Sequence, residues 1–237
     1  MKDTRRGKPR PQANKSKAGN QESGEQAAKR VKKIALPLVF LLLASFNASF
    51  GAEGNPLVDI HELDPDIKLE LRYATTNNFV GEKLYAEARC LLRREVAGKL
   101  LHVQKNLEKR GLGLKIFDGY RPLSVQKKLW AKYPVEGFVA NPAKGSNHNR
   151  GAAVDVTLVD AQGRELPMPS AYDEFSERAH RDYAGGTPEE RRNRQTLEEA
   201  MEKEGFTGLK TEWWHFDAEG AKRYPVLDLP FDSVPKG

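Results

Sequence analysis

The stretch that decides the fold is Leu114-Lys115-Ile116-Phe117-Asp118-Gly119-Tyr120-Arg121-Pro122. Leu114 to Phe117 is typical of a strand, and the turn-forming residues that follow end it. On the N-terminal side, from Ala86 to Arg110, apolar residues recur at spacings of three and four, and Gly111 follows as a stop signal; they are Leu92, Val96, Leu100, Val103 and Leu107. The sequence therefore predicts an amphipathic helix that leads directly into a strand.

Beyond this stretch, helix and strand signals continue to alternate. A short helix is expected from Ser124 to Lys132, a loop rich in Gly, Asn and Pro at 137–150, and a strand from Ala153 to Val159. A further helix should begin at Thr187-Pro188-Glu189-Glu190, which has the pattern of a capping box with proline at the first helical position, and should end at Gly205. Mixed helix and strand without internal repeats is therefore the predicted class.

Charge is distributed unevenly along the 237 residues. The chain has 39 Lys and Arg against 33 Asp and Glu, but 11 of the basic and 3 of the acidic residues lie in residues 1–50. The remainder carries 28 basic and 30 acidic residues. The net charge of +6 thus belongs to the N-terminus, and the rest offers no charge-based reason to expect a nucleic-acid partner.

The N-terminus has the pattern of a targeting segment. The basic residues 29–33 precede an apolar run of 13 residues, Ile34 to Phe46, and small residues surround Gly51. This run is nearer to the core of a secretory signal than to a membrane span of about 20 residues. We expect residues 1–51 to be a basic disordered segment plus a signal peptide or, if uncut, an N-terminal anchor, and residues 52–237 to form one domain. The protein would then be exported to the periplasm or cell envelope, with membrane contact only through an uncleaved N-terminal segment.

Cys90 is the only cysteine, so no internal disulfide can form. Its apolar neighbours favour a buried structural thiol over a catalytic nucleophile.

Two short segments combine ionisable and apolar residues. In Ser146-Asn147-His148-Asn149-Arg150-Gly151-Ala152-Ala153-Val154-Asp155 a loop histidine precedes an aspartate within an apolar strand. A carboxylate between Val154 and Val156 is costly to bury unless it is paired or bound to a metal. Taken alone, Asp155 could pair with an arginine, and His148 could be an ordinary loop histidine.

The second segment is Glu212-Trp213-Trp214-His215-Phe216-Asp217. Together with His148 and Asp155, His215 would complete a set of two imidazoles and one carboxylate, which leaves zinc one open position. Glu212 could then act as the base. Because residues three apart in a regular strand face opposite sides, this requires a bulge or Glu212 at the very start of a strand. The neighbouring tryptophans are expected to be core packing around the site.

Arg121 lies in a tight turn directly after a predicted strand. Its planar, permanently charged guanidinium suits an oxyanion or a carboxylate. The alternative role is as a partner for Asp118 or another buried acid.

These three segments, in this order, resemble the D-alanyl-D-alanine dipeptidase family, the VanX-like zinc peptidases. The similar parts are Asp118-Gly119-Tyr120-Arg121-Pro122, Ser146-x-His148-x-x-Gly151-x-Ala153-x-Asp155 and Glu212-Trp213-Trp214-His215, with flanking likeness from about Leu57 to Pro230. The N-terminal 50 residues lie outside the resemblance.

The resemblance implies one Zn²⁺ per chain and a role for each matching residue. His148, Asp155 and His215 would be the metal ligands, Glu212 the general base and Arg121 the transition-state stabiliser. The substrate-binding residues would be Ser146, Tyr73 and Asp173, with Asp173 opposite the ammonium of the dipeptide.

For the fold, the resemblance implies a single α+β domain with a small antiparallel sheet, packed helices and a zinc cleft at the sheet edge. The expected function is zinc-dependent hydrolysis of D-alanyl-D-alanine by a metal-activated water, in cell-wall peptide turnover or glycopeptide resistance. Two alternatives stay open. One is a D,D-carboxypeptidase or endopeptidase acting on longer peptidoglycan stem peptides, and the other is a catalytically silent zinc-containing module that binds cell-wall peptides.

Overall fold

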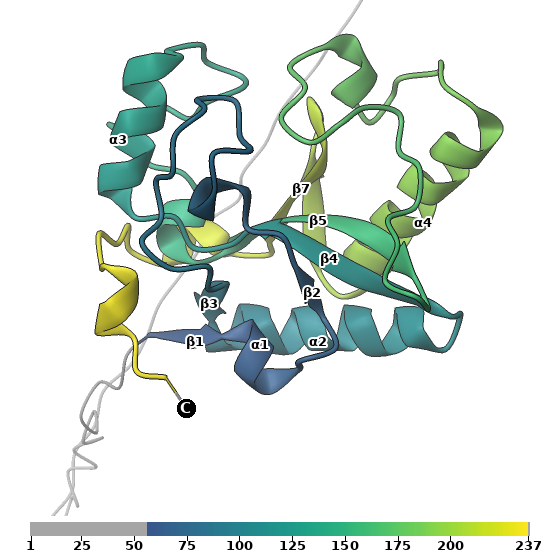
Figure 1. Cartoon of the computed structure of the whole chain (residues 1–237), viewed down its shortest axis with the longest axis horizontal. Coiled ribbons are helices and arrows are strands. Elements are labelled where there is room, and N and C mark those ends of the chain that lie inside the picture. Colours follow the sequence, from purple (N-terminus) through teal and green to yellow (C-terminus); the bar gives the residue numbers. More distant parts are fainter. Residues whose placement is uncertain (1–55, 237) are drawn as a thin grey trace, which may run out of the picture. The chain divides into compact units, whose positions relative to one another are not determined.

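Strand β5 (Ala153–Asp160) forms the centre of a five-stranded sheet in the computed structural model, which describes residues 56–236 (Figure 1). The strand order is β2-β4-β5-β7-β6. Seven of the eight residues of β5 are buried, as expected for a strand covered on both faces. The other strands of this sheet are β2 (Lys68–Leu69), β4 (Leu112–Asp118), β6 (Phe206–Leu209) and β7 (Glu212–Ala218).

The sheet is antiparallel, as predicted, except for one short strand at its edge. Strands β4, β5, β7 and β6 pair antiparallel, but β2 pairs parallel to β4, with Lys68 opposite Lys115. Parallel neighbours need a long crossover connection, and here the chain between them forms β3 (Leu91–Arg93) and helix α2 (Arg94–Glu108). A single α+β domain is confirmed.

Helix α2 begins later than the apolar spacing predicts. Residues Leu91–Arg93 form β3, which pairs antiparallel with β1 (Leu57–Asp59), so Leu92 lies opposite Val58 instead of in a helical turn. Helix α1 (Ile60–Leu63) follows β1 directly. The prediction of a helix from Ala86 is therefore wrong for its first turns, because this tertiary pairing overrides the local periodicity.

The two remaining helices agree with the sequence pattern. Helix α3 spans Leu123–Lys132, and α4 spans Pro188–Lys203. At the start of α4 the Thr187 side chain accepts from the Glu190 backbone, and the Glu190 side chain accepts from the Thr187 backbone. Both bonds of the predicted capping box are thus present.

The main core lies between the sheet and helices α2 and α4, which also pack on each other (Figure 1). Apolar residues of the two helices meet the alternate residues of β5; they include Val96, Leu100, Val103, Leu107, Leu197 and Met201 on the helices and Val154, Val156 and Leu158 on β5. Helix α3 belongs to a second buried cluster. Because strand residues alternate in direction, Asp155 and Thr157 point to the face opposite to that of Val154 and Val156.

Cys90 is buried immediately before β3, and burial raises the pKa of its thiol well above the ordinary value. A protonated, inaccessible thiol agrees with the structural role predicted for it.

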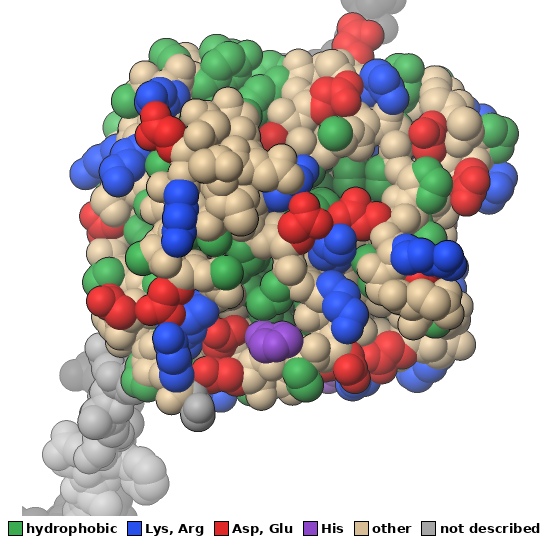
Figure 2. All heavy atoms as spheres, in the orientation of Figure 1, with side chains coloured by type: hydrophobic (Ala, Val, Ile, Leu, Met, Phe, Trp, Pro, Cys, Tyr) green, Lys and Arg blue, Asp and Glu red, His purple; other side chains and the backbone are tan. Residues whose placement is uncertain are grey.

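On the face of the molecule shown in Figure 2, acidic and basic side chains lie interspersed, so that their charges offset one another locally. Among residues 56–236, no helix is both long and apolar enough to cross a membrane. The predicted signal or anchor segment and the domain boundary at residue 51 lie outside the described residues.

Arg89 connects the C-terminal segment to the first strand. Its Nε donates to the Asp59 carboxylate at 2.8 Å, and its other nitrogens donate to the carbonyl oxygens of Phe231, Val234 and Pro235. Both charged side chains are less than a tenth exposed. An Arg89→Met variant leaves the buried Asp59 without its main cation, so we expect the free energy of unfolding to fall by about 3–5 kcal/mol in urea denaturation.

Arg164→Met is the matched control, because Arg164 is 74% exposed in its ion pair with Asp160. Its substitution should change the unfolding free energy by less than about 1 kcal/mol. Equal effects of the two substitutions would contradict the anchoring role of Arg89.

Candidate metal and catalytic site

Three acidic or imidazole side chains lie in one row across the central strands. Asp155 of β5 is directly opposite His215 of β7, and on its other side it pairs with Asp118 at the end of β4. A bulge between Ile116 and Asp118 produces this second pairing. The site therefore lies over the central strands, which corrects the expectation of a cleft at the sheet edge.

His148 reaches this row through a short helical turn, His148–Arg150, that ends at Gly151. Gly151 has φ of 67°, and an added Cβ there would lie 2.5 Å from Leu57. The His148 Nδ1 donates to the carbonyl oxygen of Gly119 at 2.7 Å. Gly119 has no room for a side chain either, since its Cβ would lie 2.7 Å from the sulfur of Cys90. The two glycines allow the close backbone approach that places His148.

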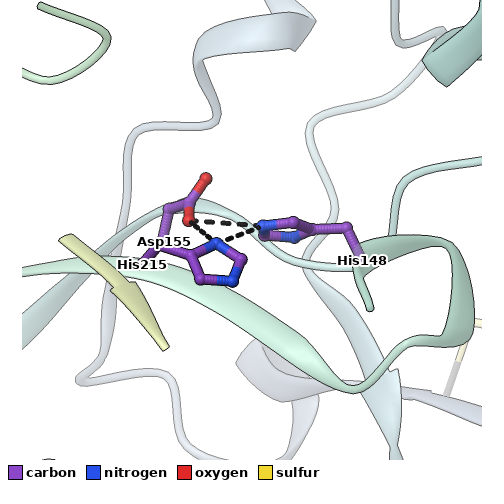
Figure 3. Close-up of side chains that lie close together, drawn as sticks. All are labelled: His148, Asp155 and His215. Atoms are coloured by element: carbon purple, nitrogen blue, oxygen red, sulfur yellow. Dashed lines mark hydrogen bonds and ion pairs between the residues drawn. The ribbon is translucent and has the colours of Figure 1, made fainter. Parts of the chain in front are cut away.

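The three predicted ligands converge on one point (Figure 3). His215 Nδ1 lies 3.0 Å from Asp155 Oδ1 and 3.1 Å from His148 Nε2, and the remaining pair is 3.3 Å apart. In a tetrahedral site with bonds of about 2.0–2.1 Å, neighbouring ligand atoms lie about 3.3 Å apart. The donor set and its spacing therefore fit a zinc-type metal centre.

In each imidazole, the ring nitrogen that points away from the shared point is already hydrogen-bonded. His148 Nδ1 donates to the Gly119 carbonyl, and His215 Nε2 donates to Asp217 Oδ1 at 3.0 Å. Each inner nitrogen is thereby left with its lone pair directed at the shared point when the ring is neutral. Sequence reasoning missed this role of Asp217, although its position two residues after His215 places both on one face of the strand.

We predict that Asp217→Asn weakens zinc binding about 10–100-fold, because the substitution removes the charged acceptor that orients His215. Competition with a chromophoric chelator measures the affinity directly. Asp232→Asn is the control, since Asp232 is exposed in the C-terminal segment. Unchanged zinc affinity in Asp217→Asn would contradict the positioning role.

The electrostatics of the cluster favour a cation. Burial alone raises the pKa of Asp155, but its contacts with His148 and His215 outweigh this and hold the pKa below its ordinary range. Burial likewise lowers the pKa of His215, yet hydrogen bonds to Asp155 and Asp217 raise it to about 10. The carboxylates thus stabilise positive charge at His215, and the same field would favour a divalent cation.

Glu212 has the position in its strand that its spacing from His215 requires. It is the first residue of β7, and the pairing with β6 shifts register between Gly208 and Leu209. Glu212 and His215 consequently line the same cavity, with Glu212 Oε2 4.0 Å from His215 Nδ1. Burial and the repulsion of Asp155 raise the pKa of Glu212 to about 7, although nearby cationic groups oppose them. A carboxyl group with this pKa is suited to exchange protons near neutral pH.

Arg121 is held rigidly at the side of the cluster. Its Nε and Nη2 donate to the fully buried Asp118 at 3.0 and 2.7 Å, and its Nη1 donates to Gln126 at 2.9 Å. Nη2 lies 4.0 Å from Asp155 Oδ2, and Arg121 lines the cavity. The two roles predicted for Arg121, binding an oxyanion and pairing with Asp118, are therefore compatible, because the ion pair with Asp118 holds the guanidinium at the site. Gln126 had no recognisable signal in the sequence.

Tyr172 is a further residue that sequence reasoning missed. Its hydroxyl donates to Asp155 Oδ2 at 3.0 Å, and thus binds the carboxylate oxygen that does not face the histidines. Burial raises the pKa of Tyr172 well above its ordinary value, so the phenol stays protonated. Only the folded chain brings this loop residue to β5.

The ligand cluster opens into a cavity of about 700 Å³. All three predicted substrate-binding residues line it. Tyr73 donates its hydroxyl to Asp173 Oδ2 at 3.3 Å, and the Arg121 guanidinium lies 5.0 Å above the Tyr73 ring. Ser146 accepts a hydrogen bond from the His148 backbone at 3.2 Å, so it also supports the turn that carries the histidine.

Asp173 has a strained backbone as well as a buried carboxyl group. Its φ of 59° makes it the one non-glycine residue with positive φ within residues 56–236. Burial, reinforced by the charge of Asp155, raises its pKa well above the ordinary value. A cation bound in the cavity would reverse this shift, which makes Asp173 a suitable partner for an ammonium group.

Comparisons with known proteins agree with this geometry. A family model described as D-Ala-D-Ala dipeptidase, Peptidase M15, matches residues 53–236. D-alanyl-D-alanine dipeptidase of Escherichia coli (strain K12) is 40% identical over 171 residues, which cover 72% of this chain and 89% of that relative. The enzyme of the same name from Enterococcus faecium is 32% identical over 181 residues, with coverage of 66% and 88%.

Solved structures show more distant similarity. The LdcB LD-carboxypeptidase has a TM-score of 0.42 at 20% identity, with 73% of each chain covered. The vancomycin resistance D,D-dipeptidase VanXYg has a TM-score of 0.37 at 20% identity, with 57% of this chain and 55% of that chain covered. From the family match and the identity to its relatives, the chain belongs to the D-Ala-D-Ala dipeptidase family of metallopeptidases.

Proposed function

We propose that this protein hydrolyses the dipeptide D-Ala-D-Ala with one zinc ion held by His148, Asp155 and His215. The observation that carries the proposal is the convergence of three ligand atoms within 3.3 Å of one another beside a buried Glu212 carboxyl group. Two relatives named D-alanyl-D-alanine dipeptidase align with this chain over 89% and 88% of their own lengths.

Zinc in this site would make water more acidic and polarise the scissile carbonyl group. Glu212 lies at the wall of the same cavity and takes the proton of the attacking water as a general base, then returns it to the leaving amine. Burial raises the pKa of this carboxyl group towards neutrality, and the positive charge of a bound zinc ion would favour the carboxylate form that accepts the proton.

Arg121 donates to the oxygen that gains charge during the attack. Its interactions with Asp118 and Gln126 fix the guanidinium before substrate arrives, so little reorganisation is needed in the transition state. Such a contact strengthens as the charge develops and therefore lowers the barrier, whereas equal binding of the ground state would not.

Asp173 binds the ammonium group of the dipeptide, and Tyr73 orients Asp173 through its hydroxyl hydrogen bond. The ammonium would restore the charged form of the Asp173 carboxylate, which burial otherwise disfavours. Ser146 lies at the cavity wall beside His148, where its hydroxyl can contact the peptide. A substrate without a free ammonium leaves the buried acid unpaired and is rejected.

The test is alanine release from D-Ala-D-Ala by the zinc-loaded full-length protein, with L-Ala-L-Ala and a chelator-treated sample in parallel. Chelator-sensitive turnover of the D,D-dipeptide, restored by zinc, supports the proposal. Binding of D-Ala-D-Ala without turnover in a sample with stoichiometric zinc would instead identify a catalytically silent binding module.

One observation favours a second candidate, a D,D-carboxypeptidase that acts on longer peptidoglycan stem peptides. The cavity volume of about 700 Å³ is in the range that accommodates ligands larger than a dipeptide of two alanines. Adding a pentapeptide that ends in D-Ala-D-Ala to the same assay separates the two. Faster release of alanine from the pentapeptide would replace the dipeptidase proposal.

We further propose that the protein is exported to the cell envelope, on the basis of the basic residues 29–33 and the apolar run 34–46. Fusion of residues 1–51 to a reporter that is active only outside the cytoplasm tests export. The mass of the mature protein distinguishes cleavage after Gly51 from a retained anchor, and an inactive reporter would contradict both.

A further inference from the structure

A second cavity of about 500 Å³ lies on the same face of the sheet as the metal site. Thr157 follows Asp155 by two residues on β5, and Trp213 precedes His215 by two on β7. All four side chains therefore point to the same side of the sheet. None of the residues that line this cavity lines the catalytic one. Tyr172 joins the two, because it lines the second cavity and its hydroxyl binds Asp155.

Two buried polar groups at this second cavity have unused hydrogen-bonding capacity. Thr157 is 1% exposed, and its hydroxyl has no hydrogen-bond partner among the described residues. The buried Nε of Arg72 also has none, since Glu70 binds only the Nη1 of this guanidinium. Buried polar groups without partners are rare and costly in native proteins. Two of them at one cavity therefore point to a ligand that supplies the missing acceptor.

The lining determines the chemistry of that ligand. Arg72, Thr157 and Arg178 all offer donors, whereas the carboxylate of Glu165 is already bound by Lys115 at 2.9 Å. A guanidinium and a hydroxyl group that line one cavity match the oxygens of a carboxylate.

Apart from the hydroxyl groups of Ser170 and Tyr172, the rest of the lining is apolar. Phe117, Trp213 and Met168 contribute hydrophobic walls, and the Arg72 guanidinium stacks on Phe117 at 5.5 Å. We propose that this cavity is a second binding site, specific for a small carboxylate with a short apolar body, such as a free amino acid or a short-chain acid.

The three tryptophans allow occupancy of the two cavities to be distinguished. Trp213 lines the second cavity, Trp214 lines the catalytic cavity, and Trp130 lines neither. Zinc-loaded full-length protein labelled with 5-fluorotryptophan therefore reports each site through its own ¹⁹F resonance, assigned with single tryptophan-to-phenylalanine variants. Acetate and D-alanine serve as the probes. Comparing them distinguishes a site that binds only the carboxylate from one that also contacts the ammonium group.

We expect acetate to shift the Trp213 resonance in a saturable manner. Thr157→Val, which removes the hydroxyl at nearly constant size, should weaken this response about tenfold or more, since the bond to a charged group is lost. Thr157→Ser keeps the hydroxyl and should retain binding. The Trp214 response to either probe should be the same in both variants.

A shift confined to Trp214 would show that carboxylates bind only in the catalytic cavity and would overturn the proposal. So would an unchanged Trp213 titration in a folded Thr157→Val protein. An unchanged melting temperature of each variant serves as the folding control. Because binding is read without turnover, this result is independent of whether D-Ala-D-Ala is hydrolysed.

Discussion

Glu212→Gln is expected to lower kcat for D-Ala-D-Ala by about 100- to 10,000-fold while zinc remains bound. The amide keeps the size of the side chain but cannot take a proton from the attacking water. Glu212 is 8% exposed, lines the catalytic cavity, and its Oε2 lies 4.0 Å from His215 Nδ1. Steady-state kinetics, with zinc content measured on the same sample, gives the effect.

The matched control is Glu219→Gln, because Glu219 follows the end of β7 and is 80% exposed. Its kcat should equal that of the unmodified protein. Near-normal turnover by zinc-loaded Glu212→Gln would show that Glu212 is not the general base. Loss of zinc from that variant would instead show that Glu212 supports the metal, so metal content separates the two roles.

Arg121→Lys is expected to lower kcat by about 100- to 1,000-fold with a smaller change in KM. Lysine keeps the positive charge but loses the planar fork that binds Asp118 through two nitrogens and Gln126 through the third. An ammonium on a flexible stem is not held where the oxyanion forms. The kcat and KM of the zinc-loaded variant measure this directly.

Stability must be measured beside activity, because Asp118 is completely buried. Retaining a cation at position 121 avoids leaving that carboxylate unpaired, which would cost about 3–5 kcal/mol. Arg164→Lys, in an exposed pair with Asp160, is the control and should leave kcat unchanged. Normal kcat in a folded Arg121→Lys protein would show that charge alone suffices and that the fork has no catalytic role.

Local chemistry makes the principal site residues recognisable in the amino-acid sequence. An aspartate within an apolar strand, histidines beside bulky residues and an arginine after a strand are each costly in a folded protein unless they serve a function or find a partner. The capping box at Thr187 and Glu190 is equally recognisable, because both of its hydrogen bonds lie within one turn of chain. Patterns of this kind need no information from distant segments.

Predictions failed where two distant segments compete for the same residues. Leu92 fits the helical spacing, but pairing with β1 turns it into a strand residue. The parallel pairing of β2 with β4 is likewise set by the path of the intervening chain, and no local pattern in Lys68–Leu69 predicts it. Only the folded molecule decides between such alternatives.

By itself, the sequence determined which side chains could hold a metal and move a proton: His148, Asp155, His215 and Glu212. The tertiary structure alone decided how they are oriented. It placed Asp217 and Tyr172 on the outer atoms of the ligands and brought Gln126 to Arg121. The physical reason is that donor chemistry belongs to a residue, whereas hydrogen bonds within about 3 Å between remote segments depend on strand register and loop packing.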